Sequence, residues 1–288
     1  MRIDFHCHIF QSTGLNSLSA LTNQFKEFNE YGFYQRMIKK VQAIKSIETD
    51  NIIDKTLYHA KQAQLDKIIL LPLSINENEK VKEWAKYAPE VFIPFYNPPE
   101  KIEQVKSLGK TIDEVFTVEN YKGIKVMLAF RKKFLNDKNL YPIWEIAERL
   151  DLPVLFHTGY PPPGTKKQVL SYANPIVLEE IFANFPKLKT IIAHMGFPFT
   201  DMAFSLAVQY PNVYLDISNL TYMMPTRLKA FIIDAKEIIG VHKILFGSDA
   251  FCPEMLEITI NYFKNVDFLT DNEINKIVGL NAKKLLRL

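Results

Sequence analysis

Short apolar runs, many of them β-branched, recur along the chain and are separated by longer segments of helical periodicity. Continuous apolar runs, as opposed to alternating ones, are typical of strands that are covered on both faces of a parallel sheet. The pattern predicts eight strands, at Arg2–His8, Lys67–Leu73, Val91–Tyr96, Gly123–Leu128, Pro153–His157, Thr190–His194, Val213–Ser218 and Lys243–Asp249.

Amphipathic helical patterns fill the intervals between the predicted strands. Asn78–Ala88 places its apolar residues on one helical face, and Pro142 suits the first turn of a helix over Tyr141–Asp151. A further helix starts where Asn174 can serve as N-cap, with Pro175 at the first helical position. Eight strand–helix units predict a (β/α)8 TIM barrel. A doubly wound open sheet is the alternative, but no glycine-rich turn follows the first strand.

The interval between His8 and Lys67 is longer than one helix requires. We expect a helical insertion over about residues 11–50, at the carboxyl face of the barrel. Since no linker divides the chain, we expect one barrel domain over residues 1–288. Five aromatic residues of the insertion either line a pocket there or pack the insertion onto the barrel: Phe25, Phe28, Tyr31, Phe33 and Tyr34.

Composition and charge exclude several classes of protein. The chain has 288 residues, of which 48% are hydrophobic and 23% charged, with a formal net charge of +3. Its lysine pairs are scattered, so nucleic-acid binding is not indicated, and no apolar run is long enough to cross a membrane. Cys7 and Cys252 do not make a disulfide framework, which favours the cytoplasm. We expect a small-molecule substrate; a homo-oligomer is compatible with these features.

Four of the six histidines stand at the ends of predicted strands. His6 and His8 end the first strand, His157 the fifth and His194 the sixth, and Asp249 ends the eighth. Residues two apart on a strand point the same way, so the first two histidines should share one face. The carboxyl ends of barrel strands meet at a single face of the fold. We therefore expect these five side chains to converge.

Such a set suits a divalent metal ion. Neutral imidazoles and a carboxylate are typical ligands of zinc and similar ions. Bound metal lowers the pKa of its water towards ~7, and a nearby carboxylate can then take the proton. Burying the same groups without a partner would be costly. His59 and His242 fall away from the strand ends, and we interpret them as packing or surface residues.

The ordered motifs resemble those of the amidohydrolase superfamily. They are HCH at His6–His8, HTG at His157–Gly159, AHMG at Ala193–Gly196, FGSD at Phe246–Asp249 and the terminal NAKKLLRL at Asn281–Leu288. They are most similar to the amidohydrolase-2 branch, which also contains relatives of aminocarboxymuconate-semialdehyde decarboxylase. The resemblance runs from the first strand to the last residue and implies a metal-dependent TIM-barrel enzyme.

The resemblance implies a role for each matching residue. His6, His8 and His157 would be metal ligands, and Asp249 both a ligand and the proton shuttle for metal-bound water. His194 matches a strand-6 histidine that polarises the substrate or positions the water. One divalent ion is implied, with zinc as the expected metal.

Lys125 on the fourth predicted strand leaves three interpretations open. In two-metal branches of the superfamily a strand-4 lysine is carbamylated and bridges the ions. Lys125 could instead contact substrate or Asp249 without carbamylation, or be purely structural. Among loop residues, Arg131 could hold a carboxylate and Tyr160 could meet the substrate, although a structural role suits each as well. Cys7 should point away from the site.

These features predict a hydrolase in which metal-activated water attacks an amide, lactone or ester-like carbon of a small molecule. Asp249 and His194 would be its catalytic residues. The alternative on the same scaffold is a metal-dependent non-oxidative decarboxylase or hydratase acting on an unsaturated or aromatic carboxylic acid. A third class, a metal-free barrel that only binds a ligand, is opposed by the complete set of five site residues.

Overall fold

The computed structural model describes residues 1–10, 18–100, 111–161 and 169–288. These residues contain eight strands in the predicted order, each inside its predicted interval but shorter. They are β1 (Ile3–Cys7), β2 (Lys67–Leu70), β3 (Phe92–Pro94), β4 (Ile124–Val126), β5 (Val154–Phe156), β6 (Thr190–Ile192), β7 (Val213–Asp216) and β8 (Ile244–Leu245).

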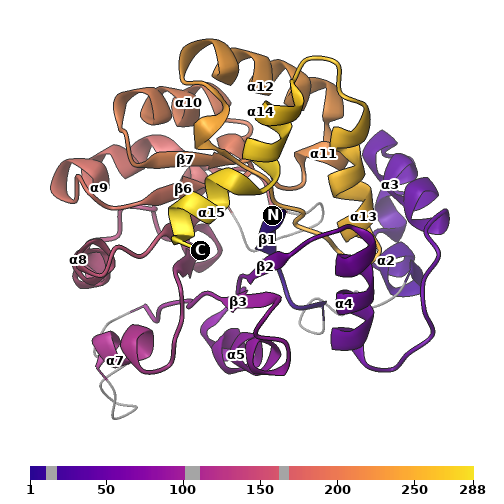
Figure 1. The fold of residues 1–288 in the computed structure, drawn as a ribbon. Helices are drawn as coiled ribbons and strands as arrows, with labels where there is room; N and C mark the ends of the chain where they lie inside the picture. Colours follow the sequence, from indigo (N-terminus) through magenta and orange to yellow (C-terminus); the bar gives the residue numbers. More distant parts are fainter. Residues whose placement is uncertain (11–17, 101–110, 162–168) are drawn as a thin grey trace.

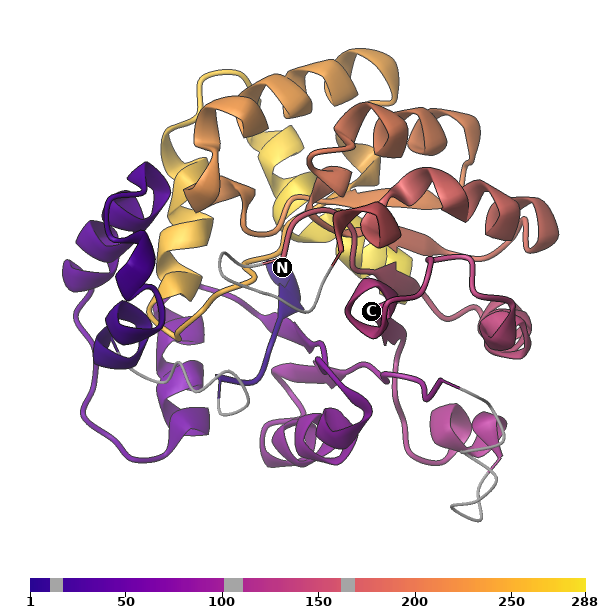
Figure 2. The same ribbon diagram turned by 180° about the vertical axis from the view of Figure 1, so that it is seen from behind.

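The strands close into a barrel. All ladder pairs are parallel, and they run in two sets, β1-β2-β3 and β4 to β8 in order. A bridge between Tyr96 and Ile124 joins β3 to β4. The backbone N–H of Phe5 donates to the carbonyl of Phe246 at 2.9 Å and joins β1 to β8. Figures 1 and 2 show the helices outside this ring of strands, which confirms the predicted (β/α)8 barrel.

Helices cover the outer face of the strands and one end of the barrel. The α-helices in the described residues are α2 (Leu18–Gln24), α3 (Gly32–Gln42), α4 (Ile52–Gln62), α5 (Asn78–Tyr87), α7 (Ile112–Thr117), α8 (Tyr141–Arg149), α9 (Glu179–Asn184), α10 (Thr200–Gln209), α11 (Leu220–Met223), α12 (Pro225–Ile238), α13 (Met255–Asn261), α14 (Asp271–Asn275) and α15 (Asn281–Leu286).

The predicted helix starts agree with the structure. Helix α5 begins at Asn78, and α8 has Pro142 in its first turn. The side chain of Asn174 accepts a hydrogen bond from the N–H of Ile176 at 3.0 Å, so it caps a short 3-10 helix (Pro175–Leu178) that leads into α9. Local capping chemistry therefore sets these boundaries.

The insertion after β1 is helical, as predicted, and contains α2, a 3-10 turn (Lys26–Phe28) and α3; residues 11–17 lie outside the described part of the chain. Figure 1 shows α2 and α3 beside α13. Phe25 and Tyr34 are buried, and the Phe25 ring lies 5.1 Å from that of Phe251. The contacts of these two aromatic residues thus support packing of the insertion onto the barrel.

A β-bulge in β1 directs the residues of the first motif. Ile3 and Phe5 pack in the inner core of the barrel, together with Leu285 of α15, which Figure 1 shows across one end of the ring. Strict alternation would then point Cys7 inward as well, but the register with β2 shifts between Asp4 and Cys7. Cys7 packs in the outer core instead, as predicted. Such a bulge re-aims side chains beside functional sites.

Candidate metal centre and active site

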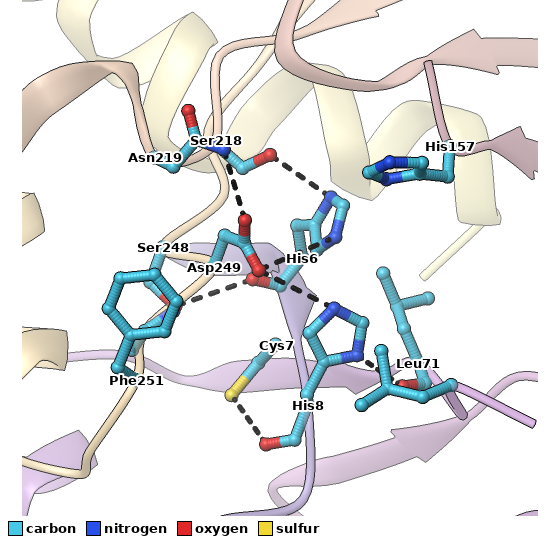
Figure 3. Close-up of polar contacts among 12 residues, drawn as sticks. His6, Cys7, His8, Leu71, His157, Ser218, Asn219, Ser248, Asp249 and Phe251 are labelled. Carbon is cyan, nitrogen blue, oxygen red and sulfur yellow. Dashed lines mark hydrogen bonds and ion pairs between the residues drawn. The ribbon is translucent and has the colours of Figure 1, made fainter. Parts of the chain in front are cut away.

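The carboxyl ends of the strands bring four of the predicted site residues, His6, His8, His157 and Asp249, to one end of the barrel (Figure 3). His6 lies in β1, while His8 and His157 directly follow β1 and β5. His194 and Asp249 lie in turns beyond β6 and β8, whereas the sequence pattern placed them on the strands. Both have positive φ angles, 55° and 45°. Left-handed backbone at non-glycine residues is strained and is often found at functional sites.

His6 is held by a carboxylate from β7, two strands away around the barrel. Its Nδ1–H donates to Oδ2 of Asp216 at 2.5 Å, and both side chains are buried. Bonding at Nδ1 leaves Nε2 free to act as an electron-pair donor. Burial lowers the pKa of His6 well below its usual value, so the imidazole is neutral. That is the form that binds a metal ion.

His8 is oriented in the same manner by a backbone group. Its Nδ1–H donates to the carbonyl oxygen of Leu71 at 2.6 Å, which leaves Nε2 as the acceptor nitrogen. This Nε2 lies 3.4 Å from Oδ1 of Asp249, and Nε2 of His6 lies 3.9 Å from the same oxygen. The two imidazole nitrogens that carry no hydrogen and one carboxylate oxygen therefore face a common point.

Asp249 is the carboxylate of this cluster that reaches the pocket. Burial alone would raise its pKa, but a hydrogen bond with His8 and the nearby imidazoles hold that pKa well below its usual value. The Asp249 side chain is therefore ionised. Its backbone N–H donates to the carbonyl of His6 at 2.7 Å, and its carbonyl accepts from the Tyr222 hydroxyl at 2.9 Å. These bonds fix the turn after β8 against β1.

His194 and His157 form a second pair of imidazoles at the site. Nε2 of His194 lies 3.4 Å from Nδ1 of His157, and burial lowers the pKa of both rings. On its other side, Nδ1 of His194 lies 3.0 Å from Nδ2 of Asn219 and 2.9 Å from Oγ of Ser218. Asn219 also donates to Oδ2 of Asp249 at 3.1 Å.

Lys125 is fully buried on the inner face of the barrel. Its Nζ lies 3.2 Å from Nε2 of His6, and burial lowers the pKa of the ammonium to about 8. Lys125 thus contacts a candidate metal ligand, and a role for it beyond that contact remains a prediction.

The donor set fits a divalent ion. His6, His8 and Asp249 offer ligand atoms that lie within 4.8 Å of one another, and so do His6, His194 and Asp216. Neutral imidazoles combined with carboxylates match the preference of zinc and similar ions. His6 donates to Asp216 and His8 donates to the Leu71 carbonyl; metal ligands typically have such supporting acceptors. His157, predicted as a ligand, lies against His194 and does not belong to either of these groups.

An apolar cavity of about 160 Å³ is bordered by Asp249. Tyr160 lines it, as the sequence suggested, and the Tyr160 ring lies 5.8 Å from that of Phe197. The described lining is His157, Tyr160, Pro161, His194, Phe197, Asn219, Leu220, Met223, Met224, Asp249 and Phe251. A mainly apolar wall with polar groups gathered at one end is typical of a small-molecule site.

Arg131 lies outside this described lining. Its Nη2 donates to the amide oxygen of Asn97, a buried residue that follows β3. The other terminal guanidinium nitrogen, Nη1, is buried without a hydrogen-bond partner. Its proposed contact with a substrate carboxylate therefore remains a prediction. His242 is exposed, and His59 is buried between Ser46 and Glu257, well outside the cluster.

Sequence reasoning missed Asp216 and did not recognise the two contacts of Asn219. Asp216 stands in an otherwise apolar run, VYLDIS, and a lone acidic residue near the end of a buried strand was the available signal. Asp4 was missed too. Its buried carboxylate accepts from the N–H groups of Ser248 at 2.8 Å and His6 at 3.1 Å, and burial raises its pKa to about 7.

A closed parallel barrel with histidines and aspartates at the carboxyl ends of its strands defines a class of metal-dependent enzymes. The family model Amidohydro_2, described as amidohydrolase, matches residues 3–288. The chain therefore belongs to this amidohydrolase family, which indicates an enzyme. No helix in the described ranges combines the length and apolar character needed to cross a bilayer.

Known proteins resemble the chain in sequence or in fold. Protein fluG of Emericella nidulans is 30% identical over 115 residues, which are 39% of this chain and only 13% of that protein. An uncharacterized TIM-barrel protein of Bordetella bronchiseptica has a TM-score of 0.74 at 18% identity, covering 99% of this chain and 98% of that one.

A dihydroxybenzoic acid decarboxylase of Polaromonas sp. JS666, with bound manganese and the inhibitor 2-nitroresorcinol, has a TM-score of 0.65 at 16% identity. The match covers 100% of this chain and 97% of that chain. At these identities the structural likenesses show a shared barrel fold.

Proposed function

We propose that the chain is a hydrolase that cleaves an amide, lactone or ester-like bond of a small molecule. The position of Asp249 carries this proposal. Its Oδ1 faces the Nε2 atoms of His6 and His8, and the same residue borders the cavity. An ionised carboxylate in this place can accept a proton from water and return it to a leaving group.

We propose that His6, His8 and Asp249, whose ligand atoms lie within 4.8 Å of one another, hold one divalent ion, and that this ion is zinc. His157, which lies beside His194, would complete the ligand set. When bound there, a divalent ion would polarise the scissile carbonyl and lower the pKa of water towards ~7. Lys125 stays uncarbamylated in this scheme, because a single ion needs no bridging group.

His194 would orient the substrate. It borders the cavity between His157 and Asn219, so a carbonyl placed over Asp249 lies within reach of the imidazole. Burial keeps the ring neutral, and a neutral imidazole can donate one hydrogen bond from an N–H group. Donation to a carbonyl oxygen that gains negative charge stabilises the transition state.

The cavity limits the size of the substrate. A cavity of about 150 Å³ accommodates one benzene molecule, and the volume here is about 160 Å³. Phe197, Leu220, Met223 and Phe251 supply its apolar walls. The group that enters it should therefore be a single apolar ring or an alkyl chain of similar volume.

A decarboxylase acting on an aromatic or unsaturated acid is the second candidate. The apolar walls fit an aromatic ring, and one protein of the same fold is a dihydroxybenzoic acid decarboxylase. In that reaction Asp249 or His194 would transfer a proton to carbon as the carboxylate leaves as carbon dioxide. We also propose a cytoplasmic location, whichever of the two reactions the enzyme catalyses. The thiols of Cys7 and Cys252 are buried and form no disulfide, which fits this location.

One experiment separates the two candidates. The zinc-loaded protein is incubated with phenyl acetate, a small aromatic lactone and 2,6-dihydroxybenzoate, and acid release and carbon dioxide release are measured in parallel. We expect acid release from an ester or the lactone, lost in Asp249→Asn and retained in the surface variant Asp201→Asn. Release of carbon dioxide without acid release would mean that the enzyme is a decarboxylase and not a hydrolase.

Metal analysis tests the single-ion proposal. It should give one zinc per chain, and two ions with a carbamylated Lys125 would contradict the proposal.

A further inference from the structure

The side chain of Asn219 contacts two candidate catalytic residues, His194 and Asp249; Figure 3 shows Asn219 beside Asp249. It follows β7 with a left-handed φ of 56°, and its side chain forms no cap on the short helix α11. The side chain turns into the site instead. Its Nδ2 lies 3.1 Å from Oδ2 of Asp249 and 3.0 Å from Nδ1 of His194. An amide nitrogen carries two hydrogens, so both contacts can be hydrogen bonds at the same time.

The carboxylate of Asp249 determines which end of the amide faces it. If the amide of Asn219 were reversed, its oxygen would lie against a carboxylate oxygen, and two acceptors would be in contact. The nitrogen must therefore face Asp249. Because the same nitrogen contacts His194, its second hydrogen points at Nδ1 of that ring, and Nδ1 must accept.

A neutral imidazole that accepts at Nδ1 carries its hydrogen on Nε2. Two atoms of Ser218 also contact Nδ1 of His194. The carbonyl at 3.2 Å favours a hydrogen on Nδ1, but the hydroxyl at 2.9 Å can donate to this nitrogen. The hydroxyl also has Asp216 within 2.8 Å as a competing acceptor. The Asn219 contact, at 3.0 Å and with a donor only, decides in favour of Nε2–H.

We propose that Asn219 is a positioning residue that sets the tautomer of His194 and the orientation of Asp249. By holding Oδ2 of Asp249, it leaves Oδ1 directed at the imidazoles of His6 and His8. By donating to Nδ1 of His194, it keeps the ring hydrogen on Nε2, which lies 3.4 Å from Nδ1 of His157. A substrate carbonyl that enters beside His194 would take this hydrogen in place of His157. The use of this hydrogen in catalysis rests on the proposed function, whereas the tautomer does not.

Histidine-selective ¹⁵N labelling of the full chain tests the tautomer directly. Long-range ¹H–¹⁵N spectra of metal-free and zinc-loaded protein, with His194 assigned through His194→Gln, report which ring nitrogen is protonated. We expect Nε2–H in the wild type. In Asn219→Asp, a carboxylate replaces the donor, so the hydrogen should move to Nδ1. Asn219→Ala should increase the share of the Nδ1–H tautomer, because one donor to Nδ1 is lost while the Ser218 carbonyl still offers an acceptor.

Asn212→Ala is the matched control. This asparagine precedes the other end of β7 and donates to the carbonyl of Pro186, far from the cluster. Its His194 signals should equal those of the wild type. An Nδ1–H tautomer in the wild type, or unchanged His194 signals in both Asn219 variants, would overturn the proposal, whatever the activity.

Kinetics with the ester or lactone probe test the catalytic consequence. Asn219→Ala should lower kcat by about 10–100-fold, the range found when the supporting partner of a catalytic residue is removed, with a much smaller change in KM. Asn219→Asp should not restore kcat, because it cannot donate to His194. A tautomer change with unaltered kcat would overturn the assignment of His194 in the proposed function. Absence of hydrolysis in the wild type would overturn that function and leave the NMR result to decide on Asn219.

Discussion

Asp216 accepts the Nδ1 hydrogen of His6 at 2.5 Å, across the inside of the barrel. The bond fixes the ring so that Nε2 faces Asp249, although Asp216 itself does not reach the cavity. Supporting contacts of this kind typically change metal affinity by 10–100-fold when removed. We expect Asp216→Asn to weaken zinc binding by about that factor, measured by competition with a chromophoric chelator. Asp201→Asn, an exposed change on α10, should leave the affinity unchanged; equal affinities in the two variants would contradict the supporting role.

Removal of a ligand should empty the metal centre without unfolding the barrel. His8→Ala and Asp249→Ala each delete a side chain whose contacts lie at the carboxyl end of the barrel, away from the inner apolar core. We expect both purified variants to retain far-UV circular dichroism and to lose most of the bound metal. Activity in Asp249→Ala should fall by about 10²–10⁴-fold, the usual contribution of a proton-transfer group. His242→Ala, which changes an exposed residue of a 3-10 turn, is the control. Full metal content in Asp249→Ala would show that this carboxylate is not a ligand.

Lys125 gives the metal-free protein a pH-dependent stability. Burial lowers the pKa of Lys125 from 10.5 to about 8, so between these values the unfolded chain binds a proton that the folded chain does not. The free energy of unfolding should therefore rise with pH across this window. Lys125→Met should remove that rise and stabilise the metal-free protein below pH 8 by about 1–3 kcal/mol.

Urea denaturation at pH 7 and pH 9.5 checks the Lys125 prediction. Lys187→Met serves as a matched control, because Lys187 is exposed. The same pH slope in the wild type and Lys125→Met would mean that the buried ammonium is not the source.

A buried ion pair between Glu254 and Lys55 links the loop that follows Asp249 to α4. Glu254 accepts from Lys55 at 2.6 Å and from the Ser46 hydroxyl at 2.8 Å, and it is 5% exposed. Removing one partner of such a pair leaves the other charge without compensation. We expect Glu254→Ala to lower the free energy of unfolding by about 3–5 kcal/mol.

An exposed ion pair provides the comparison for Glu254→Ala. Asp267 pairs with Lys229 at 2.8 Å, but its side chain is 81% exposed. Exposed pairs contribute about 0–1 kcal/mol, so Asp267→Ala should have little effect in the same urea titration. Similar losses in the two variants would show that burial is not the deciding factor.

The two thiols should be unreactive in the folded protein. Burial raises the pKa of Cys7 and of Cys252 well above the usual thiol range, and the reactive species is the thiolate. We expect no fast reaction with Ellman's reagent at pH 8, and two equivalents after addition of guanidinium chloride. A fast equivalent in native buffer would place at least one thiol at an accessible site.

The sequence predicted the barrel because both of its signals are local. Each strand is a continuous apolar run, and helix starts such as Asn174 carry their own capping residue. The site residues followed from the same pattern, since His6, His8, His157, His194 and Asp249 are placed by the ends of those runs. Parallel strands then bring the five together without further information.

The features that escaped prediction depend on partners distant in the chain. The bulge that turns both Phe5 and His6 inward is a mismatch between β1 and β2, which a period-two pattern does not reveal. Asp216 acquires its role only because closure of the barrel places it beside His6. His157 contacts His194 and does not join the His6–His8 group. This choice depends on how the side chains are oriented at the carboxyl end of the barrel, which the sequence pattern does not show.

Closure of the barrel through β1 and β8 also sets the order of events during synthesis. His6 and His8 leave the ribosome before the Asp249 turn, whose backbone N–H donates to the His6 carbonyl at 2.7 Å. Until that turn docks, the Nε2 atoms of the two imidazoles lack the Asp249 carboxylate that faces them. Metal uptake should therefore be a late event in maturation, and ribosome-bound chains halted before β8 should not acquire the ion.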